Sequence, residues 1–322
     1  MKQPIFLTPY FRQKIWGGRK LQTELNYDIP AGKIGEAWVI SAYKGNSSIV
    51  ASGKYKGMTL RDLYHCNPEL FGNPTDKEFP LLIKFLDAND NLSVQVHPDD
   101  EYAKEHENDS GKTESWYVLH ADPGAKLIYG HNAKSKEELE KLIKKGEWEK
   151  LFHYVPVKTG DFFYVPAGTV HALTKGIMVI ETQQSSDVTY RLYDWDRIDK
   201  KTGKKRELHI KKSLDTIDIP FKNPNVKPVV KRVKDATITI LTQPPVSPHF
   251  YLWQIDVEGK FNWSLNNHPY LLVSVIQGEG SFICDGEEYK ISLGTNFIIP
   301  NGLENFSFKG EKLRVIISSP NN

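Results

Sequence analysis

Cysteine is scarce in this 322-residue chain, which contains only Cys66 and Cys284. The two lie far apart and form no C-x-x-C pair, so a disulfide framework is not expected and a reducing compartment fits. Long hydrophobic runs are also missing. No stretch approaches the length of a membrane span, and the N-terminal "MKQPIFLTPYFRQ" lacks the apolar core of a signal peptide. The sequence therefore predicts a cytoplasmic protein.

An excess of charge of one sign is missing too. The chain has 42 basic and 40 acidic residues, a formal net charge of +2, so a general affinity for nucleic acid or for membrane surfaces is not expected. The most basic stretch, residues 196–232, has no aromatic platform among its charges. We interpret it as a solvated connector with one short helix at 208–215, leading to a domain boundary near 225–235. No obligate protein partner is evident.

Short strand-like segments dominate what is present. They are rich in β-branched and aromatic residues and are separated by Gly, Pro, Asn or Asp, which is typical of a β sandwich or barrel. Two helices are predicted, one at 59–72 from an N-cap at Thr59, and one at 135–145 from a capping box at Ser135. The predicted strands cover residues 36–41, 47–52, 80–88, 91–97, 115–121, 125–130, 162–167, 177–183 and 189–195.

An internal repeat divides the chain. "GDFFYVPAGTVHAL" (160–173) and "GTNFIIPNGLENFS" (294–307) share a Gly, five residues, a Pro, one residue and a Gly. Turns that need positive φ explain the glycines, and a strand end explains the proline. His171 of the first copy is replaced by Asn305 in the second, so folding does not require it. The repeat therefore indicates two related β domains, of which only the first keeps a histidine for chemistry.

The stretch "LSVQVHPDD" (92–100) places polar residues on one side of a strand. Side chains alternate between faces, so Ser93, Gln95 and His97 share a side opposite three apolar residues. A wet face of an antiparallel strand has the same appearance. From these residues alone, both a ligand pair and a solvated face stay open.

The pattern Gly160-x5-Pro166-x-Gly168-x2-His171 resembles the second signature of the cupin superfamily, small β-barrels with a metal in the mouth. The first signature of that superfamily contains a His-x-His pair and a Glu. Here a Gln replaces the first His of the pair, and an insertion precedes the Glu. These departures narrow the family to which the chain is similar.

Together with further blocks, they resemble type I mannose-6-phosphate isomerases, specifically the short bacterial form. That resemblance implies a mainly β fold of two cupin-like β-barrel or jelly-roll domains with a few helical excursions. It also implies a metal-binding catalytic domain at 1–230 and a degenerate C-terminal domain without metal at 231–322. The blocks are "IWGG" (15–18), "IGEAWVIS" (34–41), "PLLIKFLDANDNLSVQVHPDD" (80–100), "GKTESWYVL" (111–119), "VPAGTVHAL" (165–173) and Ser-Asp-x-x-x-Arg (186–191).

The resemblance implies one zinc ion per chain, held by Gln95, His97, Glu114 and His171, and a catalytic arginine at Arg191. Two imidazoles, a carboxylate and an amide oxygen suit zinc first and other divalent ions behind it. The implied substrate is a small sugar phosphate, and the implied reaction interconverts mannose 6-phosphate and fructose 6-phosphate. A Lewis acid would polarise the carbonyl, and a base would move a proton between C2 and C1 through an enediol.

Four further residues are candidates for the rest of the site. Lys112 and Glu181 are candidate catalytic groups beside the ligands. Ser93 and Arg197 are candidates for binding the phosphate, because the sequence has no phosphate-cradling glycine loop and side chains must serve instead. Each charged residue has a structural alternative, as a solvated charge or as an ion-pair partner within a sheet.

Two other functions compete with this hypothesis. A cupin oxygenase holding iron would normally carry a histidine where Gln95 stands, so Gln95 argues against it. A non-catalytic sugar-binding cupin would not need Arg191 and Lys112 together with four ligands. Metal analysis with an oxygen-uptake assay separates the first alternative from an isomerase.

Overall fold

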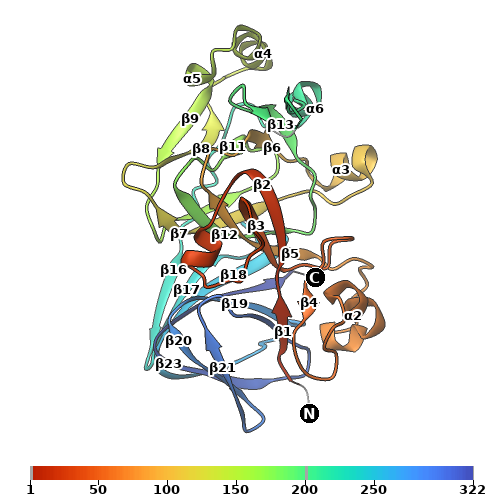
Figure 1. The fold of residues 1–322 in the computed structure, drawn as a ribbon, viewed down its shortest axis with the longest axis vertical. Coiled ribbons are helices and arrows are strands. Elements are labelled where there is room, and N and C mark those ends of the chain that lie inside the picture. The colour runs from red at the N-terminus through yellow and green to blue at the C-terminus, as the bar shows by residue number, and fades with distance from the viewer. Residues whose placement is uncertain (1–2, 200–201, 322) are drawn as a thin grey trace.

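The computed structural model describes residues 3–199 and 202–321, and strands make up most of its regular structure (Figure 1). They form a ten-stranded, a six-stranded and a five-stranded sheet and a two-stranded hairpin. The predicted mainly β class is therefore confirmed. Each predicted strand is present, although several are shorter than predicted, such as Ile49–Val50 within 47–52 and Val94–Val96 within 91–97. Among the described residues, no helix is long and apolar enough to cross a membrane.

The six-stranded sheet forms the middle of the molecule, and its central strands are buried on both faces. Residues of β5 such as Leu81, Ile83 and Phe85 share a core with Leu272 and Ile316 of the ten-stranded sheet. This double burial explains why the 80–88 stretch is almost entirely apolar. The strands, in sheet order, are β10 (Phe162–Val165), β7 (Glu114–Ala121), β12 (Ile177–Gln184), β5 (Leu81–Ala88), β3 (Ile34–Ile40) and β2 (Tyr10–Gly18).

The five-stranded sheet has one apolar and one polar face. Val94 and Val96 are fully buried, in a core shared with Leu139 and Leu151 of the helical excursion. The intervening Gln95 therefore points to the opposite side, as strand alternation requires. The strands, in sheet order, are β13 (Tyr190–Tyr193), β6 (Val94–Val96), β11 (His171–Ala172), β8 (Lys126–His131) and β9 (Phe152–Pro156).

The ten-stranded sheet contains the C-terminal strands together with two N-terminal ones. β1 pairs with β22 through Ile5 and Ile298, and Figure 1 shows the red β1 running down among the blue C-terminal strands. The strands are β16 (Val229–Val233), β17 (Ala236–Thr242), β18 (Phe250–Ser264), β23 (Asn305–Pro320), β19 (Leu271–Gln277), β22 (Asn296–Ile299), β1 (Ile5–Thr8), β4 (Ile49–Val50), β20 (Glu279–Cys284) and β21 (Glu287–Ser292). The division proposed at 230/231 falls inside β16, and it stays a proposal.

The two helices predicted from N-caps begin at those caps. α4 (Lys136–Lys145) begins after Ser135, whose hydroxyl accepts from the Glu138 N–H, and it ends at left-handed Gly146. The helix predicted at 59–72 is wrong in its length. α2 (Leu60–Cys66) is capped by Thr59 as predicted, but Pro68 begins a separate 3₁₀ turn, η1 (Pro68–Phe71), because proline cannot continue the α-helical hydrogen bonds.

The predicted connector holds more structure than expected. Its helix is confirmed as α6 (Ile210–Thr216), and it also contains the hairpin of β14 (Ile198–Asp199) and β15 (Lys204–Lys205). The remaining helices were not predicted. They are α1 (Lys20–Thr23), α3 (Asp100–Glu107) and α5 (Trp148–Leu151).

An aromatic cluster joins the segment of α2 and η1 to the C-terminal sheet. Tyr270 packs edge-on against Phe71, with ring centroids 5.3 Å apart, and stacks on Phe79 at 5.6 Å. The Tyr270 ring is fully buried, and its hydroxyl has no hydrogen-bond partner within the described part of the chain. Its apolar contacts stabilise the interface, whereas the unpaired hydroxyl costs free energy.

We therefore expect Tyr270→Phe to raise the free energy of unfolding by about 1 kcal/mol, because it removes an unsatisfied buried hydroxyl and keeps the ring. Tyr64→Phe is the matched control, since the Tyr64 hydroxyl donates to the Asp76 carbonyl at 3.2 Å. The control should be neutral or lose up to about 1 kcal/mol. Denaturant titrations of both variants measure the change, and a clear loss of stability in Tyr270→Phe would contradict the account.

Candidate active site and metal centre

Three neighbouring strands bring predicted site residues into one row. His171 of β11 pairs with Gln95 of β6, which pairs in turn with Arg191 of β13. Residues directly opposite each other on adjacent strands share a face, and here it is the polar face of the five-stranded sheet. His97 follows two residues after Gln95 and joins the same side. The sequence alternation therefore predicted this face correctly.

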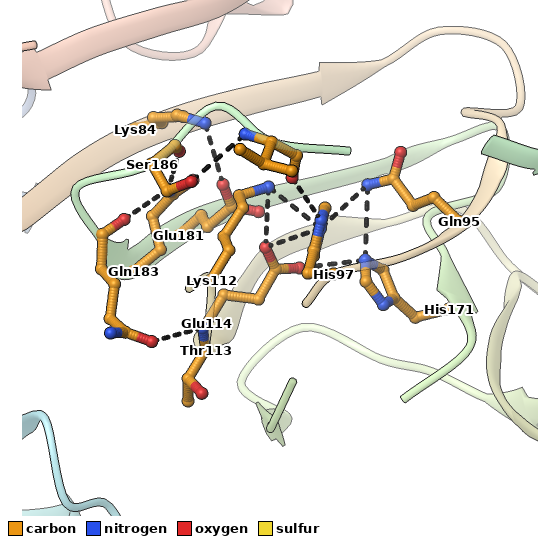
Figure 2. Close-up of polar contacts among 12 residues, drawn as sticks. Lys84, Gln95, His97, Lys112, Thr113, Glu114, His171, Glu181, Gln183 and Ser186 are labelled. Carbon is orange, nitrogen blue, oxygen red and sulfur yellow. Dashed lines mark hydrogen bonds and ion pairs between the residues drawn. The ribbon is translucent and has the colours of Figure 1, made fainter. Parts of the chain in front are cut away.

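The facing six-stranded sheet supplies the carboxylate. Glu114, the first residue of β7, places Oε2 3.4 Å from His97 Nε2 and Oε1 3.3 Å from His171 Nε2. The amide of Gln95 lies 3.4 Å and 3.3 Å from the same two imidazole nitrogens (Figure 2). Both histidines and Glu114 are buried, and their ligand atoms lie within 4.8 Å of one another.

Backbone carbonyls orient both imidazoles. Nδ1–H of His97 donates to the Val188 carbonyl at 2.8 Å, and Nδ1–H of His171 donates to the Thr169 carbonyl at 2.9 Å. Each ring therefore directs its Nε2 lone pair toward Glu114. Burial, helped by the charge of Lys112, lowers the pKa of His97 to about 3, and burial also lowers the pKa of His171. Both rings are thus neutral, the form that binds metal.

The carboxylate of Glu114 is ionised although it is buried. Burial alone would raise its pKa, but the positive charge of Lys112 outweighs it and holds the pKa well below its usual range. Lys112 Nζ lies 3.1 Å from Glu114 Oε2 and 3.0 Å from His97 Nε2. Neither carboxylate oxygen accepts a hydrogen bond within the described part of the chain.

This donor set fits a divalent metal ion. Two neutral imidazoles and a carboxylate with unsatisfied oxygens converge on one point, and they are common zinc ligands. As placed, Gln95 turns its amide nitrogen to the imidazoles and its oxygen toward the Ser93 hydroxyl, 3.4 Å away. A half-turn of the amide exchanges the two ends and adds an oxygen ligand, because the two orientations have nearly the same shape.

A cavity of about 280 Å³ opens beside this cluster. Its lining includes the candidate residues Ser93, Lys112, Glu181 and Arg191 as well as Gln95 and His171. Arg197 is not part of the lining. Its guanidinium donates to the Asn91 carbonyl and to Asp194. His97 and Glu114 are not part of the lining either, but both contact the lining residue Lys112. The structure therefore gathers the other candidates around one cavity, beside these two ligands, with Arg197 outside it.

Glu181 forms a row with two partners on the middle sheet. Its Oε2 accepts the indole N–H of Trp116 at 2.9 Å, and its Oε1 lies 3.4 Å from Lys84 Nζ. Burial, reinforced by the charge of Glu114, raises the pKa of Glu181, and burial lowers the pKa of Lys84. The pKa of the carboxyl group and the pKa of the ammonium group therefore lie closer together than in water. Groups whose pKa values are shifted toward neutral pH are suited to general acid–base catalysis.

Arg191 takes neither of the acidic partners nearest to it in sequence. Asp187 pairs with Arg12 at 2.7 Å, and Asp194 pairs with two other arginines. Arg191 donates from Nη1 to the Glu207 carbonyl at 2.7 Å, and its buried Nε has no hydrogen-bond partner within the described ranges. It is therefore a positive charge at the cavity wall without a close carboxylate.

Sequence analysis missed several charged residues of the wall. Lys84 of β5, Glu36 of β3 and Arg12 and Lys14 of β2 all line the cavity. Lys14 Nζ lies 2.8 Å from Glu36, and the Lys84 ammonium lies 4.7 Å from the centre of the Trp38 ring. The sequence did contain one indication of this wall, because Lys84 lies inside the apolar run "PLLIKFLDA". A lysine in a buried strand must be either paired with a carboxylate or functional.

Comparison with known proteins agrees with this geometry. Residues 5–124 match the catalytic domain of type I phosphomannose isomerase, and residues 240–320 match the cupin domain of mannose-6-phosphate isomerase. A mannose-6-phosphate isomerase of Streptococcus mutans is 50% identical over 100% of this chain and 99% of its own length. One from Bacillus subtilis is 45% identical over 96% of each chain.

Solved structures agree as well. The crystal structure of mannose 6-phosphate isomerase from Bacillus subtilis superposes with a TM-score of 0.94 at 41% identity, covering 98% of this chain and 99% of that one. A putative mannosephosphate isomerase from Archaeoglobus fulgidus, 19% identical with a TM-score of 0.78, shares the fold. Sequence and structure together show that the chain belongs to the type I phosphomannose isomerase family.

Proposed function

We propose that the protein interconverts mannose 6-phosphate and fructose 6-phosphate through an enediol intermediate. The family supports an isomerase, and the relatives' names supply the substrate. The observation that carries the proposal is the Glu114 carboxylate, which faces two imidazoles, one of them (His171) in the wall of a cavity that Lys112 and Arg191 also line. A ligand cluster that opens into a cationic cavity suits a small anionic sugar.

Gln95, His97, Glu114 and His171 would hold one divalent ion per chain, with zinc favoured because two neutral imidazoles and a carboxylate are among the ligands. When bound, that ion supplies a Lewis acid that polarises the sugar carbonyl. The degenerate repeat is not expected to hold a second ion, since Asn305 stands where the first repeat has its histidine.

Moving a proton between C2 and C1 requires a group that both accepts and releases it. Glu181 suits this role because its pKa is raised by burial and Lys84 lies 3.4 Å away to balance its charge. Lys112 and Arg191 are fixed positive charges at the cavity wall. They would stabilise the negative charge that develops on the enediolate oxygens, since neither group has to reorganise as the charge forms.

The two alternative functions are less well supported. An iron oxygenase is not favoured, because the family is an isomerase family and Gln95 replaces the expected imidazole. A non-catalytic sugar-binding protein would not account for the buried Glu181 and Lys84 beside the ligand cluster.

One prediction tests the metal ligands. His97→Ala should remove both the bound metal and most of the isomerase activity, because His97 supplies one of two neutral imidazoles. His153→Ala is the control, since His153 is exposed and outside the cluster. Elemental analysis of both purified proteins, beside a coupled assay of mannose 6-phosphate turnover, measures the effect. Full metal occupancy in His97→Ala would refute the assignment, and the control should retain about one metal per chain.

Another prediction tests Glu181 as the proton-transfer group. Glu181→Gln can still accept the Trp116 indole N–H but cannot take a proton, so the fold and metal should be kept while kcat falls by roughly 10²–10⁴-fold. Glu181→Asp keeps the carboxyl and should lose less. Steady-state kinetics with metal content measured alongside gives the answer, and near-normal kcat in Glu181→Gln would remove Glu181 from the mechanism.

A prediction for Arg191 separates charge stabilisation from metal binding. An arginine stays protonated near neutral pH, so Arg191 is a poor base but a good fixed cation. Arg191→Ala should keep its metal while kcat falls on the order of 10²–10³-fold and KM changes less. Arg191→Lys should restore only part of the rate, since it lacks the planar fork. A steep rise in KM with kcat preserved at saturation would instead assign Arg191 to substrate binding.

A further inference from the structure

One buried carboxylate holds two arginines at the outer edge of the five-stranded sheet. Asp194 accepts from Arg206 Nε at 2.8 Å and from Arg206 Nη2 at 2.5 Å, and its Oδ1 also accepts from Arg197 Nη2 at 2.5 Å. The Asp194 side chain is 6% exposed. A single carboxylate can neutralise only one of the two guanidinium groups, so the trio keeps one positive charge.

The two arginines differ in what they face. Arg206 lines the cavity together with Arg191, whereas Arg197 does not. Arg197 donates from Nη1 to the Asn91 carbonyl and from Nε to the Asp194 carbonyl, and its Nη1 also lies 3.8 Å from Asp90 Oδ2. Their side chains are nevertheless similarly exposed, 23% for Arg206 and 17% for Arg197. Arg197 therefore fixes the turn, and Arg206 presents its charge to the cavity.

The chain around Arg206 runs along the edge strand beside Arg191. The backbone N–H of Arg191 donates to His209 Nδ1 at 3.0 Å, and the N–H of His209 donates to the Arg191 carbonyl at 2.8 Å. The opposite edge of β13 pairs with β6. Across the sheet, His171 is followed by Gln95 and then by Arg191. The segment that contains Arg206 and Glu207 lies beyond Arg191. The ligand cluster and Arg206 thus lie at opposite ends of this row.

This order matches the two ends of a 6-phosphosugar. C1 and C2 react at the ligand cluster, and the phosphate is carried at the opposite end of the carbon chain. Arg191, Arg197 and Arg206 carry three positive charges against two negative charges, on Asp194 and Asp90, so this end of the cavity keeps a positive balance that attracts a phosphate dianion. The hydroxyls of Ser93 and Thr189 line the same cavity and can donate to phosphate oxygens.

We propose that Arg206 binds the phosphate group of the substrate at the end of the cavity away from the ligand cluster, and that Arg197 acts only by positioning Asp194. This inference rests on the proposed function, since it takes a 6-phosphosugar as the substrate. It makes Arg206 the residue through which the enzyme prefers a phosphorylated sugar to a free one. A guanidinium with part of its surface facing a cavity is well suited to phosphate oxygens.

The experiment compares Arg206→Ala with two matched variants. Arg197→Ala removes the other partner of Asp194. Lys205→Ala removes a positive charge one residue away, where exposed Lys205 pairs with Asp196. Calorimetric titration with inorganic phosphate and steady-state kinetics with mannose 6-phosphate are run on each protein. Arg206→Ala should weaken phosphate binding and raise KM by roughly 10- to 100-fold, with kcat at saturation kept within a few-fold. Arg206→Lys should restore part of the affinity.

The outcomes are distinct. Lys205→Ala should bind phosphate like the unmodified protein, and Arg197→Ala should lose less affinity than Arg206→Ala. Equal losses in Arg197→Ala and Arg206→Ala would show that the Asp194 turn, not a direct contact, sets the affinity and would overturn the inference. Unchanged phosphate affinity in Arg206→Ala, or no phosphate binding by the unmodified protein, would overturn it too. Failure of the proposed function appears separately, as phosphate binding without mannose 6-phosphate turnover.

Discussion

The contact of Glu114 with two imidazoles is the interaction on which the site depends. It joins β7 of the middle sheet to β11 and to the residue that follows β6 in the outer sheet. Both Glu114 carboxylate oxygens are buried without hydrogen bonds within the described part of the chain. Such a concentration of lone pairs is stable only beside a positive charge. Lys112 provides one, and the geometry prepares the cluster to bind a metal cation.

The layering of the sheets explains why so many charges are buried near one cavity. The middle sheet packs one face on the C-terminal sheet, and the charged residues that line the cavity lie on its other face. There the buried side chains of Lys84, Glu36 and Glu181 balance one another's charge. The C-terminal sheet thus contributes to the site by covering the back of the middle sheet, although its own repeat lacks the histidine.

Sequence patterns predicted the β architecture and the shared face of Gln95 and His97, because strand alternation is a local property. The family resemblance supplied Glu114, which no local pattern connects to His171. Lys84 and Arg206 were not predicted, since their roles depend on which strands face each other and on how a basic connector folds along β13. The helix at Asp100–Glu107 was also missed, although Asp99 caps it, because Pro98 and two aspartates resemble a simple strand end.

The most direct test of this account is a coupled assay of mannose 6-phosphate turnover before and after chelation. The account predicts that removing metal abolishes turnover while the fold is kept, as judged by circular dichroism, because the ligands are set by backbone hydrogen bonds from His97 and His171. Adding about one equivalent of zinc per chain should restore the rate. Full turnover by protein shown to be free of metal would contradict the account.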